Sequence, residues 1–125
     1  MSKNVKYVDG YVLVVPKKHL NAYRQMAAMG CKVWKKYGAL DYKECVAEDA
    51  RPKGVVFPFA KAMKAKPSEV VIFSYIGFKS RAHRDTVNAK VMKDPLMNDP
   101  KYKDKPMPFD MKRMSYGGFT VIVSK

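Results

Sequence analysis

Short segments rich in Val, Ile, Tyr and Phe recur along the chain and are separated by polar turns or by segments with helical spacing. β-branched and aromatic residues are enriched in strands, so these segments predict strands. The expected strands cover residues 7–15, 40–47, 69–78 and 113–123. The third has apolar residues on both faces, which indicates that both faces are buried.

Two segments have the spacing of amphipathic helices. Apolar residues recur every three or four positions within residues 17–37, at Leu20, Tyr23, Ala27, Cys31 and Trp34, and therefore share one helix face. Gly38 follows as a natural C-cap. Ser80 is expected to be the N-cap of a second long helix that ends near Lys93, and a shorter helix is expected within residues 57–66.

Proline and glycine shape the C-terminal part of the chain. Four prolines between Asp94 and Asp110 exclude a long regular element there and predict a structured loop. The last expected strand contains Gly117 and Gly118 side by side. Paired glycines within a strand predict a bulge, or the close approach of another backbone or a ligand.

The resulting order is strand, helix, strand, strand, helix, strand, which is the βαββαβ order of ferredoxin-like α+β folds. We expect one four-stranded, mainly antiparallel sheet with the first and third strands at its centre and both long helices on one face. The other face of the sheet would then expose apolar side chains. A second copy of the chain, packed sheet to sheet, would cover them, so the sequence predicts a homodimer.

The composition indicates a single domain spanning residues 1–125. Apolar residues make up 47% of the chain, and the chain is long enough to bury a core. None of its apolar runs approaches the length of a membrane span, about 20 residues. No apolar leader is visible at the N-terminus. The two cysteines, Cys31 and Cys45, have no metal-ligand spacing and are expected to be free thiols. This favours a cytoplasmic location, and no metal or other cofactor is expected.

The net charge of +14 is the strongest compositional signal for a partner. Lysine and arginine neutralise nucleic-acid phosphates, so an RNA- or polyanion-binding accessory protein is one hypothesis. Most of the 25 basic residues are lysines scattered along the chain, however, which is typical of a solvated surface. Non-specific binding of polyanions is expected in either case.

Short motifs run almost from end to end of the chain. They begin with Tyr7-Val8-Asp9-Gly10-Tyr11-Val12 and continue through Gly38-Ala39-Leu40, Glu44-Cys45, Val71-Ile72-Phe73-Ser74 and Arg84-Asp85. The most specific block contains Phe109, Asp110, Lys112, Gly117, Gly118 and Phe119. In these motifs the chain resembles the YbaA-like family, a bacterial family of unknown function.

The resemblance implies a dimeric α+β barrel, in which two ferredoxin-like sheets face each other, and it implies no particular reaction. The sequence departs from the family pattern at Gly77-Phe78-Lys79, at Tyr75, where Trp is common, and at residues 98–105, which are longer and richer in lysine. If the last segment forms the rim of a pocket, the choice of ligand would differ here.

Alternation along the strands sorts the polar residues into faces. Tyr7, Asp9 and Tyr11 share one face of the first strand, and the small aliphatic residues on its other face suit packing against the helices. We therefore expect the first three in the barrel interior, whereas either face of the second strand could point inward. The expected pocket is lined by Tyr7, Asp9, Glu44, Arg113 and Tyr116.

This pocket predicts binding of a small anionic organic molecule, with Arg113 as the anion clamp. Asp9 or Glu44 would serve as the base in cofactor-free acid–base chemistry, because a carboxylate in a dry barrel has a raised pKa. The structural alternative is that Asp9 and Arg113 form a buried ion pair, or that Asp110 caps the loop before the last strand. A third hypothesis for the chain is accordingly a structural or interaction protein without a ligand.

Overall fold

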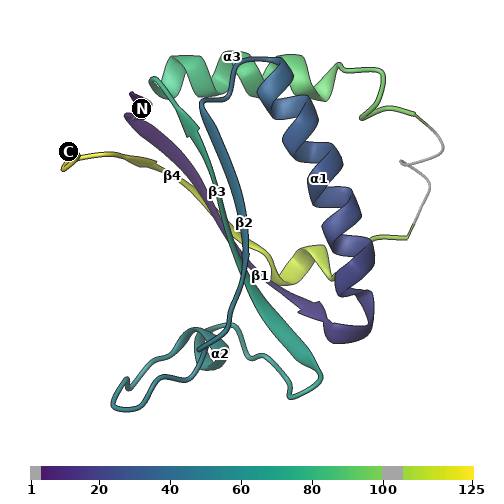
Figure 1. Ribbon diagram of the computed structural model, residues 1–125, viewed down its shortest axis with the longest axis vertical. Coiled ribbons are helices and arrows are strands. Elements are labelled where there is room, and N and C mark those ends of the chain that lie inside the picture. Colours follow the sequence, from purple (N-terminus) through teal and green to yellow (C-terminus); the bar gives the residue numbers. More distant parts are fainter. Residues whose placement is uncertain (1–3, 100–105) are drawn as a thin grey trace.

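The computed structural model describes residues 4–99 and 106–125 (Figure 1). Its elements in chain order are β1 (Tyr7–Pro16), η1 (Lys17–His19), α1 (Leu20–Lys36), β2 (Asp41–Val46), α2 (Phe59–Ala62), β3 (Glu69–Phe78), α3 (Arg81–Met92), η2 (Met111–Arg113) and β4 (Ser115–Thr120). Residues 100–105, which make up most of the lysine-rich segment, lie outside the described residues. The suggestion that this segment forms a pocket rim therefore stays a prediction.

The four strands form one antiparallel sheet in the order β2-β3-β1-β4. Helices α1 and α3 lie together on one face of the sheet, and α2 lies at one end of the sheet on the side away from α1 (Figure 1). The ferredoxin-like α+β fold is therefore confirmed, with β1 and β3 as the central neighbours. No helix within the described part of the chain is long and apolar enough to cross a membrane.

Local sequence signals set the helix ends. The Ser80 Oγ accepts a hydrogen bond from the backbone N–H of His83 at 3.0 Å and so caps α3, as predicted. Gly38 follows α1 with a φ of +109°, a conformation that other residues disfavour. The first three residues of the predicted helix 17–37 form the 3₁₀ turn η1 instead of α-helix.

The last strand is shorter than predicted at both ends, since it ends at Thr120 instead of Val123. It begins at Ser115, because residues 111–113 form the 3₁₀ turn η2. The Asp110 Oδ1 accepts a hydrogen bond from the backbone N–H of Lys112 at 2.9 Å. The structural alternative in which Asp110 caps the loop before this strand is therefore confirmed.

The predicted glycine bulge in β4 is wrong. Gly117 pairs with Gly10 and Gly118 pairs with Asp9 in a continuous register. Gly118 is needed for the space that it leaves, because a Cβ at this position would collide with the Tyr7 ring, which lies in the core. Gly118 therefore does mark a close approach, but the approaching group is the Tyr7 side chain of the same sheet and not another backbone or a ligand.

The predicted faces of β1 are also reversed. Tyr7, Asp9 and Tyr11, which were expected in the barrel interior, point toward the helices instead. Leu13 on the same face packs in a core cluster with residues of α1. The physical reason lies in α3, which supplies Arg84 and Asn88 as hydrogen-bond partners for Asp9. A fully buried carboxylate is stable only where such partners are available.

The other face of the sheet is partly uncovered. At the end next to α2, Val14 and Val71 are only 2% and 3% exposed, whereas Phe73 and Phe119 are 46% and 59% exposed. We call Val8, Val12, Phe73, Tyr75 and Phe119 the open face, because alternation places them all on the side away from α1 and α3. The expectation that β3 is buried on both faces is thus met at Val71 and not at Phe73.

Candidate functional site

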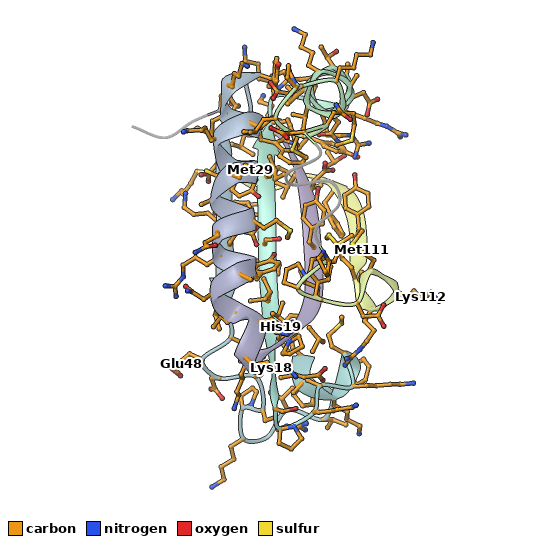
Figure 2. All side chains as sticks on the ribbon, turned by 90° about the vertical axis from the view of Figure 1, so that its right-hand side faces the viewer. Lys18, His19, Met29, Glu48, Met111 and Lys112 are labelled. Carbon is orange, nitrogen blue, oxygen red and sulfur yellow. The ribbon has the colours of Figure 1, made fainter. Side chains whose placement is uncertain are left out.

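A cavity of about 290 Å³ lies between α1 and the helix-facing side of the sheet. Its walls are mainly apolar and include six methionines: Met26, Met29, Met97, Met107, Met111 and Met114. Figure 2 labels Met29 on α1 and Met111 beside β4, so the thioethers come from segments far apart in the sequence. The aromatic lining includes Trp34 and Phe109. Thioethers are flexible and polarizable, so such walls adapt to varied apolar shapes.

Glu44 is the one carboxylate among the described residues that line this cavity. It extends from β2, and each of its oxygens accepts one tyrosine hydroxyl. The Tyr23 Oη donates to Oε1 at 2.7 Å, and the Tyr42 Oη donates to Oε2 at 3.0 Å. Glu44 itself is exposed to solvent, so it stands at the mouth of the cavity.

The close packing of α1 against β2 requires Gly30. A Cβ at this position would lie 2.9 Å from the Tyr42 Oη. Glycine therefore lets the tyrosine hydroxyl pass between helix and strand and reach Glu44. The helix accepts this residue despite a cost of about 1 kcal/mol relative to alanine.

The tyrosines of the cavity are held in their protonated form. Burial raises the pKa of Tyr23 above its usual value, and the hydrogen bond to Glu44 raises it further. Burial and the charge of Glu44 do the same for the pKa of Tyr42. Burial, followed by the charge of Asp9, raises the pKa of Tyr11. These hydroxyls therefore act as hydrogen-bond donors and not as bases at neutral pH.

A second polar network surrounds Asp9, which is 0% exposed. The Arg84 Nη1 donates to Asp9 Oδ1 at 2.7 Å and contacts the Tyr116 Oη at 2.8 Å. The Asn88 Nδ2 lies 3.4 Å from the other Asp9 oxygen, and the Asn88 Oδ1 accepts a hydrogen bond from Trp34 Nε1 at 2.9 Å. Because Trp34 lines the cavity, this network braces the cavity wall from behind.

Arg113 lies apart from both groups. Its Nη1 and Nη2 bind the two Glu69 oxygens at 2.7 and 3.1 Å, and Nη2 also donates to the Lys64 carbonyl at 3.0 Å. The hydrogen bonds from Arg113 lower the pKa of Glu69. The predicted Asp9–Arg113 ion pair is therefore wrong: each residue has a different partner.

The structure separates the five predicted pocket residues into three places. Glu44 borders the cavity, and Tyr7, Asp9 and Tyr116 gather around Arg84. Arg113 ties η2 to β3. The second strand, whose orientation the sequence left open, turns Tyr42 and Glu44 toward the helices.

Sequence reasoning missed Tyr23, Tyr42, Arg84 and Asn88 as polar partners of the site. One signal was present for the tyrosines: Tyr42 and Glu44 are two residues apart on one strand, so they share a face. Of the specific C-terminal motif, Phe109 lines the cavity and packs edge-on against Tyr23 at 5.7 Å. No comparable local signal pairs Arg84 with Asp9, because 75 residues separate them.

Within residues 4–99 and 106–125, no three His, Cys, Asp or Glu side chains are grouped closely enough to hold a metal ion. Cys31 and Cys45 are free thiols, as the sequence predicts. The polar chemistry at the cavity is thus that of a carboxylate bound by two phenol donors, with a third tyrosine, Tyr11, in the same lining.

These features define the class of protein: a ferredoxin-like α+β protein with a methionine-rich cavity between its first helix and its sheet. Residues 6–111 match the model of a family described as "Protein of unknown function (DUF1428)". The chain belongs to this family.

Curated relatives agree with this assignment. The chain is 46% identical over 121 residues to the uncharacterized protein YbaA of Escherichia coli K12, an alignment that covers 97% of this chain and 100% of the relative. YbaA of Shigella flexneri is similar to the same degree. The resemblance to the YbaA-like family is therefore confirmed.

A solved structure supports the fold at low sequence identity. It is the crystal structure of a dimeric ferredoxin-like protein from an uncultured marine organism. The two chains superpose with a TM-score of 0.53 and 11% identity, over 96% of this chain and 99% of that one. At this identity the comparison shows a common fold.

Proposed function

We propose that this protein binds a small organic molecule in the cavity between α1 and the sheet. The observation that carries the proposal is the combination of an apolar cavity with the carboxylate of Glu44, which two tyrosine hydroxyls hold at its mouth. Ligand sites are typically apolar hollows with a few fixed polar groups. The cavity replaces the sheet-to-sheet barrel interior as the proposed site.

The charge expected for the ligand changes with the site. An anionic ligand was expected because Arg113 would clamp it, and Arg113 binds Glu69 instead. Lys43 is the one cationic residue among the described residues that border the cavity, and its Nζ lies 2.6 Å from Asp41. The described lining therefore gives no cationic group that would favour an anionic ligand. Glu44 supplies a hydrogen-bond acceptor, which could also serve as a base.

We also propose that the protein is a homodimer formed through the open face. The exposed rings of Phe73 and Phe119 make this face apolar, and burying apolar surface stabilises association. The ferredoxin-like neighbour of the same fold is described as dimeric, which supports the proposal.

The free thiols of Cys31 and Cys45 are consistent with a cytoplasmic, reducing location.

The cavity can be tested through Trp34, which lines it and is the one tryptophan of the chain. We expect saturable binding of a neutral apolar probe, 4-phenylbutan-1-ol, measured by the change in tryptophan fluorescence. Ala27→Leu should fill part of the cavity and weaken binding about tenfold, because Ala27 lies in its wall. The matched control is Ala22→Leu at an exposed position of α1.

Native mass spectrometry of protein purified gently from its own host gives an independent test. A stoichiometric organic mass that is retained by the wild type and lost in Ala27→Leu would support the cavity. Fluorescence that does not saturate, together with equal behaviour of the two leucine variants, would contradict it.

A further inference from the structure

We infer that the molecule bound in this cavity has an apolar body and a head group that donates a hydrogen bond, an amino or hydroxyl group, to Glu44. This inference rests on the proposed function, since it assumes that the cavity is occupied. It predicts that the cavity prefers amines and alcohols to carboxylates. Three features of the site support it.

The first feature is the unused acceptor capacity of Glu44. A carboxylate has about four lone-pair positions, and the two tyrosine hydroxyls occupy two of them. Each of these tyrosines uses its single proton in its bond to Glu44. The triad of Tyr23, Tyr42 and Glu44 therefore offers acceptors and no spare proton, so a head group that binds Glu44 must donate.

The second feature is that the two arginines of the networks described above are already paired. Arg84 is bound to Asp9 and Asp85, and Arg113 is bound to Glu69. A ligand carboxylate beside Glu44 would experience like-charge repulsion, which weakens its binding. Arg24 borders an adjoining hollow of about 260 Å³ together with Glu44, where its side chain is exposed to water.

The third feature is the chemistry of the walls. Methionine sulfurs make favourable contacts with aromatic rings, and Trp34 and Phe109 offer ring faces and edges in the same cavity. An aromatic ring carried on a short alkyl chain fits such walls. The head group at the end of the chain would then reach Glu44 at the mouth.

The test uses three probes that share a ten-carbon skeleton and differ in the terminal group: 4-phenylbutylamine, 4-phenylbutan-1-ol and 4-phenylbutyrate. Each is titrated into the full chain while Trp34 fluorescence is recorded. We expect the amine and the alcohol to bind at least tenfold more tightly than the carboxylate. Glu44→Gln should weaken amine binding about tenfold and so reduce the difference in affinity between the amine and the carboxylate. The matched control is Glu48→Gln, at an exposed position in the segment after β2.

The possible outcomes separate this inference from the proposed function. If the carboxylate binds as tightly as the amine, or more tightly, the head-group inference is overturned while the cavity stands. If the protein prefers the carboxylate and this preference disappears in Arg24→Met, the head-group inference is likewise overturned. Arg24 would then be the cation that binds the carboxylate. If none of the three probes saturates, the proposed cavity site fails and this inference fails with it. Circular dichroism of Glu44→Gln excludes unfolding as the cause of lost binding.

Discussion

Asp9 is a carboxylate without contact to water, and it depends on Arg84 for its charge partner. Arg84 is itself largely buried, with 12% of its side chain exposed, and it also lies over the Tyr7 ring at 5.2 Å. A buried ion pair adds little net stability compared with apolar packing. Loss of one partner, in contrast, leaves a buried charge uncompensated.

We therefore expect Arg84→Met to lower the free energy of unfolding by about 3 to 5 kcal/mol. The measurement is urea unfolding followed by circular dichroism at neutral pH. Arg81→Met is the matched control, because Arg81 is exposed on the same helix and should change stability by less than about 0.5 kcal/mol. Equal, small effects of both variants would show that Asp9 does not need this partner.

The adjacent glycines of β4 offer a second comparison at the level of single residues. A Cβ on Gly118 would collide with the Tyr7 ring, whereas a Cβ on Gly117 would lie 3.6 Å from the Phe119 ring, an ordinary contact. We expect Gly118→Ala to cost about 1 to 3 kcal/mol of stability through overpacking, and Gly117→Ala to cost little. Thermal unfolding of the two variants measures the difference, and the reverse order would contradict the described packing.

At the level of elements, Asp94 connects the C-terminal ends of α1 and α3. It is buried, accepts a hydrogen bond from Tyr37 Oη at 2.6 Å and pairs with Lys36 Nζ at 3.0 Å. Its oxygens also accept a bond from the Leu96 backbone N–H at 2.8 Å. The hydrogen bond from Tyr37, followed by that from Lys36, lowers the pKa of Asp94 from 3.8 to about 2.

A carboxylate whose pKa is lowered by folding stabilises the protein above its unfolded pKa and loses this effect as the pH falls through its folded pKa. The contribution of Asp94 should accordingly be complete above about pH 4 and disappear near pH 2. We expect Asp94→Asn to unfold at lower urea concentration than the wild type at pH 6, and the difference to shrink as the pH approaches 2. A difference that does not change across this range would contradict the assigned ionisation. Glu48→Gln, at an exposed site, controls for the general effect of acid.

At the level of the whole molecule, the open face predicts the oligomeric state. Light scattering should give twice the chain mass of 14.3 kDa for the wild type. Phe73→Lys should produce monomers, because a lysine in the centre of an apolar interface would leave a charge buried. Met92→Lys on α3 is the matched control, since Met92 is exposed on the opposite layer, and it should remain dimeric. A monomeric wild type, or two dimeric variants, would contradict association through the open face.

The net charge of +14 gives a prediction that is independent of the cavity. We expect weak, sequence-independent binding of a single-stranded RNA, measured by fluorescence anisotropy, that falls about tenfold or more between 50 and 200 mM salt. Mutations in the cavity wall such as Ala27→Leu should not change it. Affinity that is insensitive to salt would contradict binding through phosphate contacts.

Most of the fold was predictable because its signals are local. The run of β-branched and aromatic residues in β3, the Ser80 cap and the apolar spacing of α1 each depend on residues close together in the sequence, and all three elements were confirmed. The end of the chain was less predictable. Gly117 and Gly118 signal a special backbone or a close contact, and only the position of Tyr7 across the sheet decides between them.

The candidate site was predictable only in part. Glu44 was singled out and borders the cavity, because a polar residue in an apolar strand stands out within the sequence itself. The face of β1 was assigned incorrectly from side-chain size. The orientation of this strand depends on whether a helix supplies an ion-pair partner for Asp9. The sequence does not show that Arg84 packs next to Asp9.

The order of strands and helices, the class of fold and the excess of positive charge follow from the sequence alone, through local periodicity, turn residues and composition. The family follows from the short motifs that run along the chain. The tertiary structure decided which side chains meet: Asp9 with Arg84, Arg113 with Glu69, and Tyr23 and Tyr42 with Glu44. The reason is that an ion pair or a cavity forms between residues tens of positions apart, and its geometry follows only once helix and sheet have packed together.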